Sequence, residues 1–181
     1  MIKLNDFFER DAVVVARELL GKVIVIGNLK VRIVETEAYG GDAASHAFKR
    51  TERSALMFDT FGSVYVYLIY GMYNCLNFTT NSIGSPGAVL IRAVEPISGI
   101  EKMQERRGTE KINNLCSGPG KLCQALGIDK KFNGLELGRE LVVYDDGFEV
   151  DEIGRSSRIG IKDALDLEWR FFIVGNGFVS K

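Results

Sequence analysis

Apolar and polar residues recur along this chain in short segments that predict strands and helices. A helix is predicted over 12–20, between the N-cap residue Asp11 and the helix-ending Gly21. Two runs rich in β-branched residues, 22–26 and 30–39, predict a pair of strands joined by a Gly-Asn turn. Further strands are predicted at 64–79, which form a hairpin, and at 88–94, 140–144 and 169–174.

Two more helices and two loops complete the predicted order of elements. Helical spacing predicts helices over 97–107 and 119–128, and the second begins with a proline, which suits a first helical turn. Residues 40–63 and 108–118 have no clear period and are expected to be loops; the first is long enough to suggest a functional role. No repeat or linker interrupts the pattern, so residues 1–181 are expected to form a single α+β domain with a mixed, mainly antiparallel sheet.

The predicted hairpin, VYVYLIYGMYNCLN at 64–77, carries two tyrosines at its tip. Gly71 at the first central position suits a type II′ turn, and Tyr70 and Tyr73 flank it. Loop tips usually carry small polar residues, so an aromatic pair here needs a partner that covers it. Three partners remain open: the core of the protein itself, another protein, or a base stack that the tip enters as a wedge.

The segment VETEAY at 34–39 places two carboxylates on one strand face. Alternate residues of a strand share a face, so Glu35, Glu37 and Tyr39 lie together. If that face is buried, at least one acid is expected to have a raised pKa or a basic partner. Arg92, inside the apolar LIRAVE, in turn needs an acid. The face could carry a general acid or base beside an aromatic platform, or it could simply meet solvent.

Charge gives a mixed indication about nucleic acid. A net charge of −1 and a pI near 5.9 argue mildly against it, because nucleic-acid-binding domains are usually basic. However, residues 101–131 carry a net charge of +3 and residues 132–181 a net charge of −4, so the chain can still present one positive face. Within SGPGKLCQ, Lys121 stands early in a predicted helix, near a turn that could approach a backbone phosphate.

Cysteine usage and the N-terminal residues bear on metal binding and location. Cys75, Cys116 and Cys123 match no zinc-binding spacing, and His46 is the single histidine, so no metal is expected and the thiols are interpreted as buried. No apolar run reaches membrane-spanning length, and charges stand where a signal peptide is apolar. A cytoplasmic protein without a membrane partner is therefore expected, and nothing requires more than a monomer.

Four long motifs follow one another along the chain: VETEAY at 34–39, YVYLIYGMYNCLN at 65–77, LIRAVEP at 90–96 and SGPGKLCQALGI at 117–128. Shorter ones are RIGI at 158–161 and WRFFI at 169–173. In sequence and order they resemble the alkyladenine (3-methyladenine) DNA glycosylases. This resemblance implies a curved sheet flanked by helices, with a protruding hairpin that intercalates into double-stranded DNA containing alkylated bases.

The same resemblance implies a role for each candidate residue. Glu37 is the general base, and with Arg92 and the backbone carbonyl of Ile159 it holds a water molecule against the sugar C1′. Tyr70 fills the gap left when a damaged purine flips out of the duplex, and its neighbours Met72 and Tyr73 also meet the DNA. The flipped base is expected to be bound by Tyr39, His46, Tyr67 and Asn77, the last of which helps to reject guanine.

The implied reaction uses no metal or cofactor. An N3- or N7-alkylated purine is cationic and leaves readily, and stacked aromatic rings favour the cation. One carboxylate then suffices where ordinary sugar hydrolases need two. Water as the nucleophile leaves an abasic site without cutting the strand. Two other functions stay open: a non-catalytic module that binds damaged DNA, and a nucleoside or sugar glycosidase that uses Glu35 and Glu37 as its pair.

Overall fold

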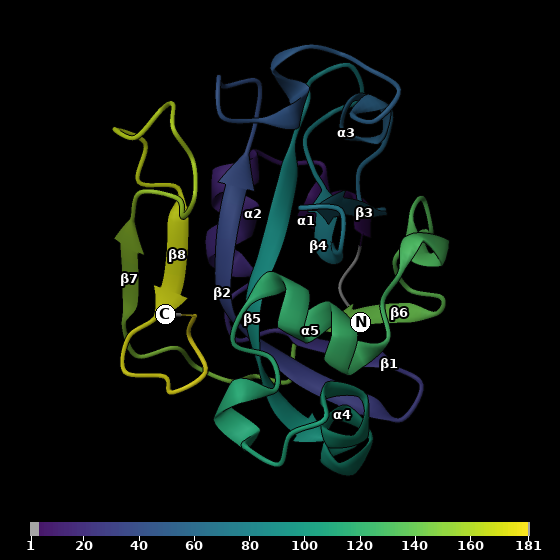
Figure 1. Cartoon of the computed structure of the whole chain (residues 1–181). Helices are drawn as coiled ribbons and strands as arrows, with labels where there is room; N and C mark the ends of the chain where they lie inside the picture. The colour runs from purple at the N-terminus through teal and green to yellow at the C-terminus, as the bar shows by residue number, and fades with distance from the viewer. Residues whose placement is uncertain (1–3, 181) are drawn as a thin grey trace.

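A curled antiparallel sheet is the frame of this computed structural model, which describes residues 4–180 (Figure 1). Within those residues eight strands pair in the order β3-β4-β5-β2-β1-β6, and β8 lies beside β2 and pairs with β7. The strands are β1 Val23–Ile26, β2 Leu29–Tyr39, β3 Val64–Ile69, β4 Tyr73–Thr79, β5 Ala88–Ser98, β6 Leu141–Tyr144, β7 Ile153–Ser156 and β8 Arg170–Ile173. The predicted single α+β domain with a mainly antiparallel sheet is confirmed.

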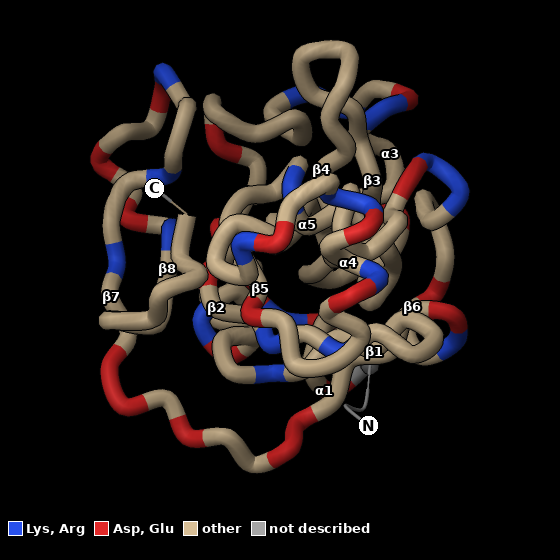
Figure 2. The backbone as a smooth tube through the Cα atoms, turned by 60° about the horizontal axis from the view of Figure 1, so that its bottom comes forward, with Lys and Arg blue, Asp and Glu red and all other residues tan. Residues whose placement is uncertain are grey.

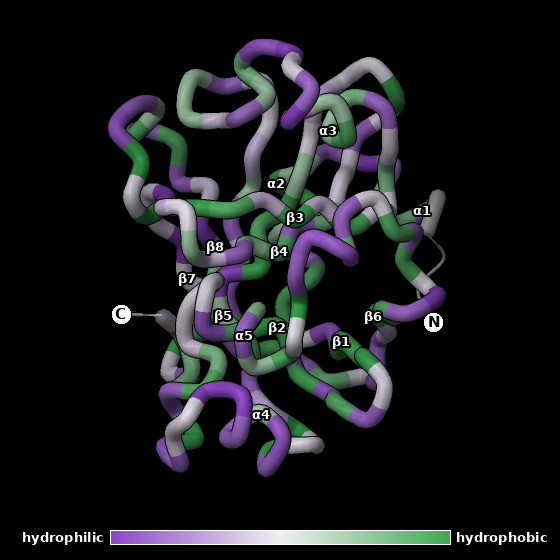
Figure 3. The backbone as a smooth tube through the Cα atoms, turned by 45° about the vertical axis from the view of Figure 1, so that its right-hand side comes forward, coloured by the Kyte–Doolittle hydropathy of each residue, from purple (hydrophilic) through white to green (hydrophobic). Residues whose placement is uncertain are grey.

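Helices cover both faces of the sheet. Helix α2 (Ala12–Glu18) packs against β2 and β5, whereas α5 (Pro119–Leu126) packs against β4 and β5. Figure 1 shows α2 behind the sheet and α5 in front of it. The other helices are α1 Leu4–Phe8, α3 Ala55–Asp59 and α4 Ile100–Arg107, with 3-10 turns at His46–Phe48, Ile112–Asn114 and Lys130–Phe132. Hydrophobic residues follow the strands, and α4 is largely hydrophilic (Figure 3).

Local chemistry explains where the helices begin. The Asp11 carboxylate accepts hydrogen bonds from the first amides of α2, and Pro119 lies in the first turn of α5, both as predicted. The helix predicted over 97–107 begins only at Ile100, because residues 97 and 98 extend β5 and Ser98 pairs with Lys30. The sequence did not predict α1 or β7, which are too short for a period to stand out.

The hairpin of β3 and β4 forms as predicted, but its turn differs. Ile69 pairs with Tyr73, and the Met72 amide donates to the Ile69 carbonyl at 3.2 Å. Tyr70 and Gly71 are therefore the central residues, with φ values of 52° and 70°, as in a type I′ turn and not the predicted type II′. No Lys, Arg, Asp or Glu lies between residues 60 and 91, so both strands of the hairpin are drawn tan in Figure 2.

Candidate active site

Strand β2 is buried on both of its faces. On one face Thr36 donates a hydrogen bond to the Ala16 carbonyl of α2 at 2.8 Å. On the other, Glu35 and Glu37 are 0 % exposed, so the interpretation of this face as a solvent-facing surface is wrong. Arg92 on β5 lies 3.1 Å from Glu35 and 3.3 Å from Glu37, which confirms that the buried arginine has acid partners.

Three donors fix the carboxylate of Glu37. Its Oε1 accepts the Ile159 amide at 2.6 Å, and its Oε2 accepts the Tyr39 hydroxyl at 2.9 Å and Arg92 Nη1 at 3.3 Å. Burial raises the pKa of Glu37 above its ordinary value, although the charge of Arg92 and the bonds from Ile159 and Tyr39 oppose the rise. The contact from Ile159 comes through its N–H, because a carboxylate accepts hydrogen bonds, whereas the expected role of this residue involved its carbonyl.

The four residues expected to bind a base line one cavity of about 190 Å³. They are Tyr39, His46, Tyr67 and Asn77, and Ile159 also borders the space. The rings of His46 and Tyr67 lie 4.5 Å apart, centre to centre, at 76°. The loop over 40–63 thus folds back over the strand that carries Glu37, which brings together residues widely separated in the sequence.

The polar groups of this cavity are held by their neighbours. His46 Nδ1 lies 3.3 Å from the Tyr65 hydroxyl, and burial together with the charge of Arg53 lowers the pKa of His46, so its imidazole is neutral at pH 7. Asn77 is buried and donates through Nδ2 to the carbonyls of Tyr65 and Cys75 at 3.1 and 3.2 Å. Its orientation is therefore set by the backbone of the hairpin.

The hairpin tip projects beside a second cavity of about 440 Å³, here called the outer cavity, which Arg92 and the start of α5 also line. Tyr70, Met72 and Tyr73 are 81 %, 66 % and 50 % exposed, so the protein's own core does not cover the tip. Tyr73 leans on α5, where a Cβ atom at Gly120 would come within 3.0 Å of its ring. Tyr65, in contrast, is 3 % exposed and packs in a small apolar cluster beside the first cavity.

Comparison with known proteins identifies the family. Residues 6–177 match the family model described as methylpurine-DNA glycosylase. The chain belongs to this family. A "putative 3-methyladenine DNA glycosylase" from Clostridium novyi (strain NT) is 46 % identical over 200 residues, covering 100 % of both chains. Proteins of the same name from Rhizobium johnstonii, 48 % identical over 98 % of this chain and 89 % of theirs, and Alkaliphilus oremlandii, 45 % identical over 98 % of both, are also similar.

Family membership makes the chain a DNA glycosylase, so DNA is its substrate. The resemblance seen in the motifs at 34–39, 65–77, 90–96 and 117–128 is thereby confirmed. The motifs converge in space as well. Three of them supply Glu37, Arg92 and the tyrosines of the two cavities, and the fourth supplies the start of α5 that borders the outer cavity.

Lys121 lies at the rim of the outer cavity of this glycosylase. Its Nζ donates to Asn114 Oδ1 at 2.6 Å and lies 3.5 Å from Ser117 Oγ. The ammonium group is thus held by the segment that precedes α5, and its contact with a DNA phosphate stays a prediction.

The sequence did not indicate the role of Arg158, which links three segments of the site. The Arg158 guanidinium, 0 % exposed, bonds both Asp42 oxygens at 2.6 and 3.1 Å and lies between the rings of Tyr39 and Trp169, at 4.7 and 5.1 Å. It precedes Ile159, whose amide bonds Glu37. Although burial favours the neutral form, the hydrogen bonds and charge of Arg158 lower the pKa of Asp42. The signal in the sequence was the arginine of RIGI, directly before Ile159.

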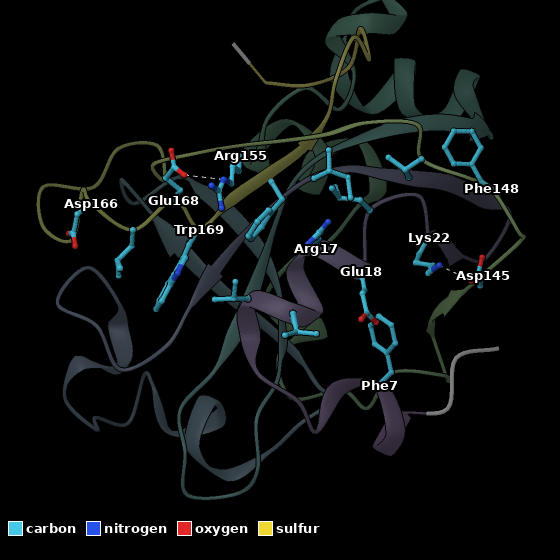
Figure 4. A pocket seen from close by; sticks show the side chains of 17 residues that line it. Phe7, Arg17, Glu18, Lys22, Asp145, Phe148, Arg155, Asp166, Glu168 and Trp169 are labelled. Atoms are coloured by element: carbon cyan, nitrogen blue, oxygen red, sulfur yellow. Dashed lines mark hydrogen bonds and ion pairs between the residues drawn. The ribbon is translucent and has the colours of Figure 1, made fainter.

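The remaining surface features lie outside this site. A groove of about 1060 Å³ runs between α2, β7 and β8, lined by the pairs Lys22–Asp145 and Arg155–Glu168 (Figure 4). Cys75, Cys116 and Cys123 are buried thiols, as predicted, and burial raises the pKa of Cys75 to about 11. Among residues 4–180, no three His, Cys, Asp or Glu side chains are grouped to hold a metal, and no helix has the length and apolarity of a membrane span.

Proposed function

We propose that this glycosylase releases alkylated purines, such as 3-methyladenine, from duplex DNA by hydrolysing the N-glycosidic bond. The observation that carries the proposal is the carboxylate of Glu37, which is fully buried yet bonded to Arg92, Tyr39 and the Ile159 amide. A desolvated carboxylate with a raised pKa and a fixed orientation is suited to general-base catalysis. The names of the relatives favour 3-methyladenine as one substrate.

The first cavity suits a flat, cationic base. Its aromatic walls, from Tyr39, His46 and Tyr67, present electron-rich ring faces, which attract a cation more strongly than a neutral base. The lowered pKa of His46 keeps a second positive charge out of the cavity at neutral pH. Asn77 limits the size and hydrogen bonding of the base that can enter.

The reaction then needs one carboxylate. The bond between C1′ and the base nitrogen breaks, its electron pair neutralises the cationic base, and positive charge develops on the sugar. Glu37 takes a proton from water as the water oxygen bonds to C1′, and Arg92 keeps the carboxylate oriented. The products are a free purine and an abasic site in an uncut strand, and the step requires no cofactor.

The hairpin supplies the means of reaching a base inside a duplex. Tyr70 is exposed, uncharged and held on a rigid two-strand support, as a wedge between base pairs requires. Lys121 and Arg107 line the outer cavity next to the tip, which supports the proposal that they meet the backbone of the opened strand. One copy of the chain carries all of these groups, so we propose that it acts as a monomer.

A two-carboxylate glycosidase is disfavoured by the position of Glu35. Its two oxygens accept four hydrogen bonds, from Arg92, Arg170 and the amide and hydroxyl of Ser180, so both are occupied by donors of the protein itself. A non-catalytic module is disfavoured as well, because it needs no carboxylate whose pKa is raised by burial, as that of Glu37 is.

The test replaces Glu37 with glutamine, which keeps the shape and removes the base. Glu37→Gln should bind a duplex containing one alkylated purine but release the base about 10²- to 10⁴-fold more slowly than the wild type in single-turnover assays. The exposed Glu140→Gln is a matched control and should behave as the wild type. Base release by Glu37→Gln at the wild-type rate would refute the role of Glu37.

A further inference from the structure

The carboxylate of Glu35, which the proposed reaction does not use, is the most heavily bonded group near the site. Its Oε1 accepts Arg92 Nε at 3.1 Å, Arg170 Nε at 2.7 Å and the Ser180 hydroxyl at 2.8 Å. Its Oε2 accepts the Ser180 amide at 2.7 Å. A buried carboxylate with this many donors is held in one orientation.

Ser180 reaches Glu35 because the segment after β8 turns back along the sheet. Asn176 begins the return by donating to the Glu95 carboxylate at 3.0 Å and accepting from the Phe178 amide at 2.9 Å. The side chains of Phe178 and Val179 pack against the main core. Three anchors thus precede Ser180, so its position is fixed by the fold.

The Ser180 hydroxyl also joins Glu35 to Arg92. It donates to Glu35 at 2.8 Å and accepts from Arg92 Nη2 at 3.4 Å. The Arg92 guanidinium consequently has a partner at each nitrogen: Glu35 at Nε, Glu37 at Nη1 and Ser180 at Nη2. A planar guanidinium group that is bonded at all three nitrogens cannot rotate away from Glu37.

Arg170 completes the charge balance of the buried group. It comes from β8, where it pairs with Glu37 in register, stacks on Phe172 at 4.6 Å and donates to Ser156 Oγ at 3.1 Å. Its bond to Glu35 means that two guanidinium groups face two carboxylates. Without Arg170, both acids would compete for Arg92 alone.

We propose that Glu35, Arg170 and Ser180 are positioning residues that hold the Arg92 guanidinium against Glu37, and that Glu35 takes no part in bond cleavage. This inference rests on the proposed role of Glu37 as the general base. It gives Ser180, which lies 88 residues from Arg92 in the sequence, a role in orienting the catalytic group as well as in packing.

The test follows the pH dependence of single-turnover base release from a lesion duplex. The groups that face Glu37 are Glu35 and Tyr39 of β2, Arg92 of β5 and Cys75 of β4, with Arg170 of β8 beyond Glu35. Release rises with pH as Glu37 loses its proton. Glu35→Gln removes a neighbouring negative charge and should move this rise to lower pH, whereas Arg170→Gln removes a positive charge and should move it to higher pH, each by about half a unit to one unit.

The double variant Glu35→Gln/Arg170→Gln restores the balance of charge and separates an electrostatic role from a structural one. Its pH profile should return close to that of the wild type, with a lower plateau because Arg92 has lost an anchor. Ser180→Ala should lower the plateau about three- to tenfold, the loss expected for one ordinary hydrogen bond, because Arg92 keeps its bonds at Nε and Nη1. The exposed Arg155→Gln, from the neighbouring strand β7, and Ser98→Ala are matched controls and should leave the profile unchanged.

Shifts of Glu35→Gln and Arg170→Gln in the same direction, or a double variant displaced further than either, would overturn the inference. So would a Glu35→Gln variant that binds the lesion duplex but loses release as fully as Glu37→Gln, because Glu35 would then be a catalytic acid. These outcomes are distinct from failure of the proposed function, which Glu37→Gln alone decides. Thermal unfolding of each variant shows that the profiles come from folded protein.

Discussion

Substitution of Tyr70 is the change that best separates an effect on function from an effect on the stability of this glycosylase. It lies at the hairpin tip with a φ of 52°, a backbone conformation that residues other than glycine rarely adopt, and it is 81 % exposed. A tyrosine that is strained and uncovered contributes little to the fold. We therefore expect Tyr70→Gly and Tyr70→Ala to lose flipping while keeping the structure, and to differ from each other in stability.

The magnitude follows from burial and strain. About a fifth of the side-chain surface is covered, which is about 40 Å² of the roughly 200 Å² of a tyrosine, so truncation costs about 1 kcal/mol. Alanine keeps the strained φ, whereas glycine relieves about 1 kcal/mol of it. Tyr70→Ala should thus unfold about 2–4 °C below the wild type and Tyr70→Gly close to it.

The assay pairs thermal unfolding with base release from the same lesion in duplex and in single-stranded DNA. Both variants should release base slowly from the duplex, with a much smaller loss on the single strand, where less unstacking is needed. Tyr70→Phe keeps the ring and should retain activity on both. A Tyr70→Ala variant destabilised by more than about 3 kcal/mol would show that the tyrosine belongs to the core, and equal losses on both substrates would refute the wedge.

Three further outcomes are expected from the charged groups of the site. Arg158→Lys should slow base release about tenfold or more and move its rise to higher pH, because lysine cannot bond Asp42 bidentately and the Ile159 amide then leaves Glu37; Arg155→Lys is the control. The raised pKa of Glu37 gives stability that is complete below about pH 4.5 and is lost as the pH rises through the folded-state pKa, so the Tm advantage of Glu37→Gln over the wild type should grow between pH 4 and 7. Because the pKa of His46 is lowered, lesion affinity of Glu37→Gln should hold from pH 8 to about 6.5 and fall only below that, and a His46→Gln background should abolish the fall.

Local patterns predicted the parts of the site that lie within single strands. Alternation placed Glu35, Glu37 and Tyr39 on one face, and the hairpin placed Tyr70 at a tip, because strand periodicity depends only on neighbouring residues. The turn was wrong by one position, since turn type depends on which residues pair, and the pairing of Ile69 with Tyr73 is not encoded in the tip alone. The burial of both faces of β2 was likewise beyond reach, because it requires knowing that α2 lies behind the strand and that Ile159 and Ser180, far along the chain, lie against its other face.

Long-range contacts mark the limit of sequence reasoning. Glu35 meets Arg170 and Ser180 across 135 and 145 residues, and Arg158 meets Asp42 across 116, and no pattern of neighbouring residues carries such information. The family resemblance carried the roles of Glu37 and Arg92 but gave none to these partners.

The two carboxylates of β2 differ in what surrounds them, and this difference organises the chemistry. Glu35 faces β8 and the returning chain and is bonded by two arginines and a serine, so it is an anchor. Glu37 bonds Tyr39 and the Ile159 amide, two residues that line the cavity proposed to hold the base. It shares Arg92 with Glu35, so its charge is less compensated, and burial raises its pKa. In the proposed mechanism, two identical side chains on one strand face are thereby divided between support and catalysis. A hydrolase with a cationic leaving group needs one working carboxylate, and the second is available to hold the arginine that orients the first.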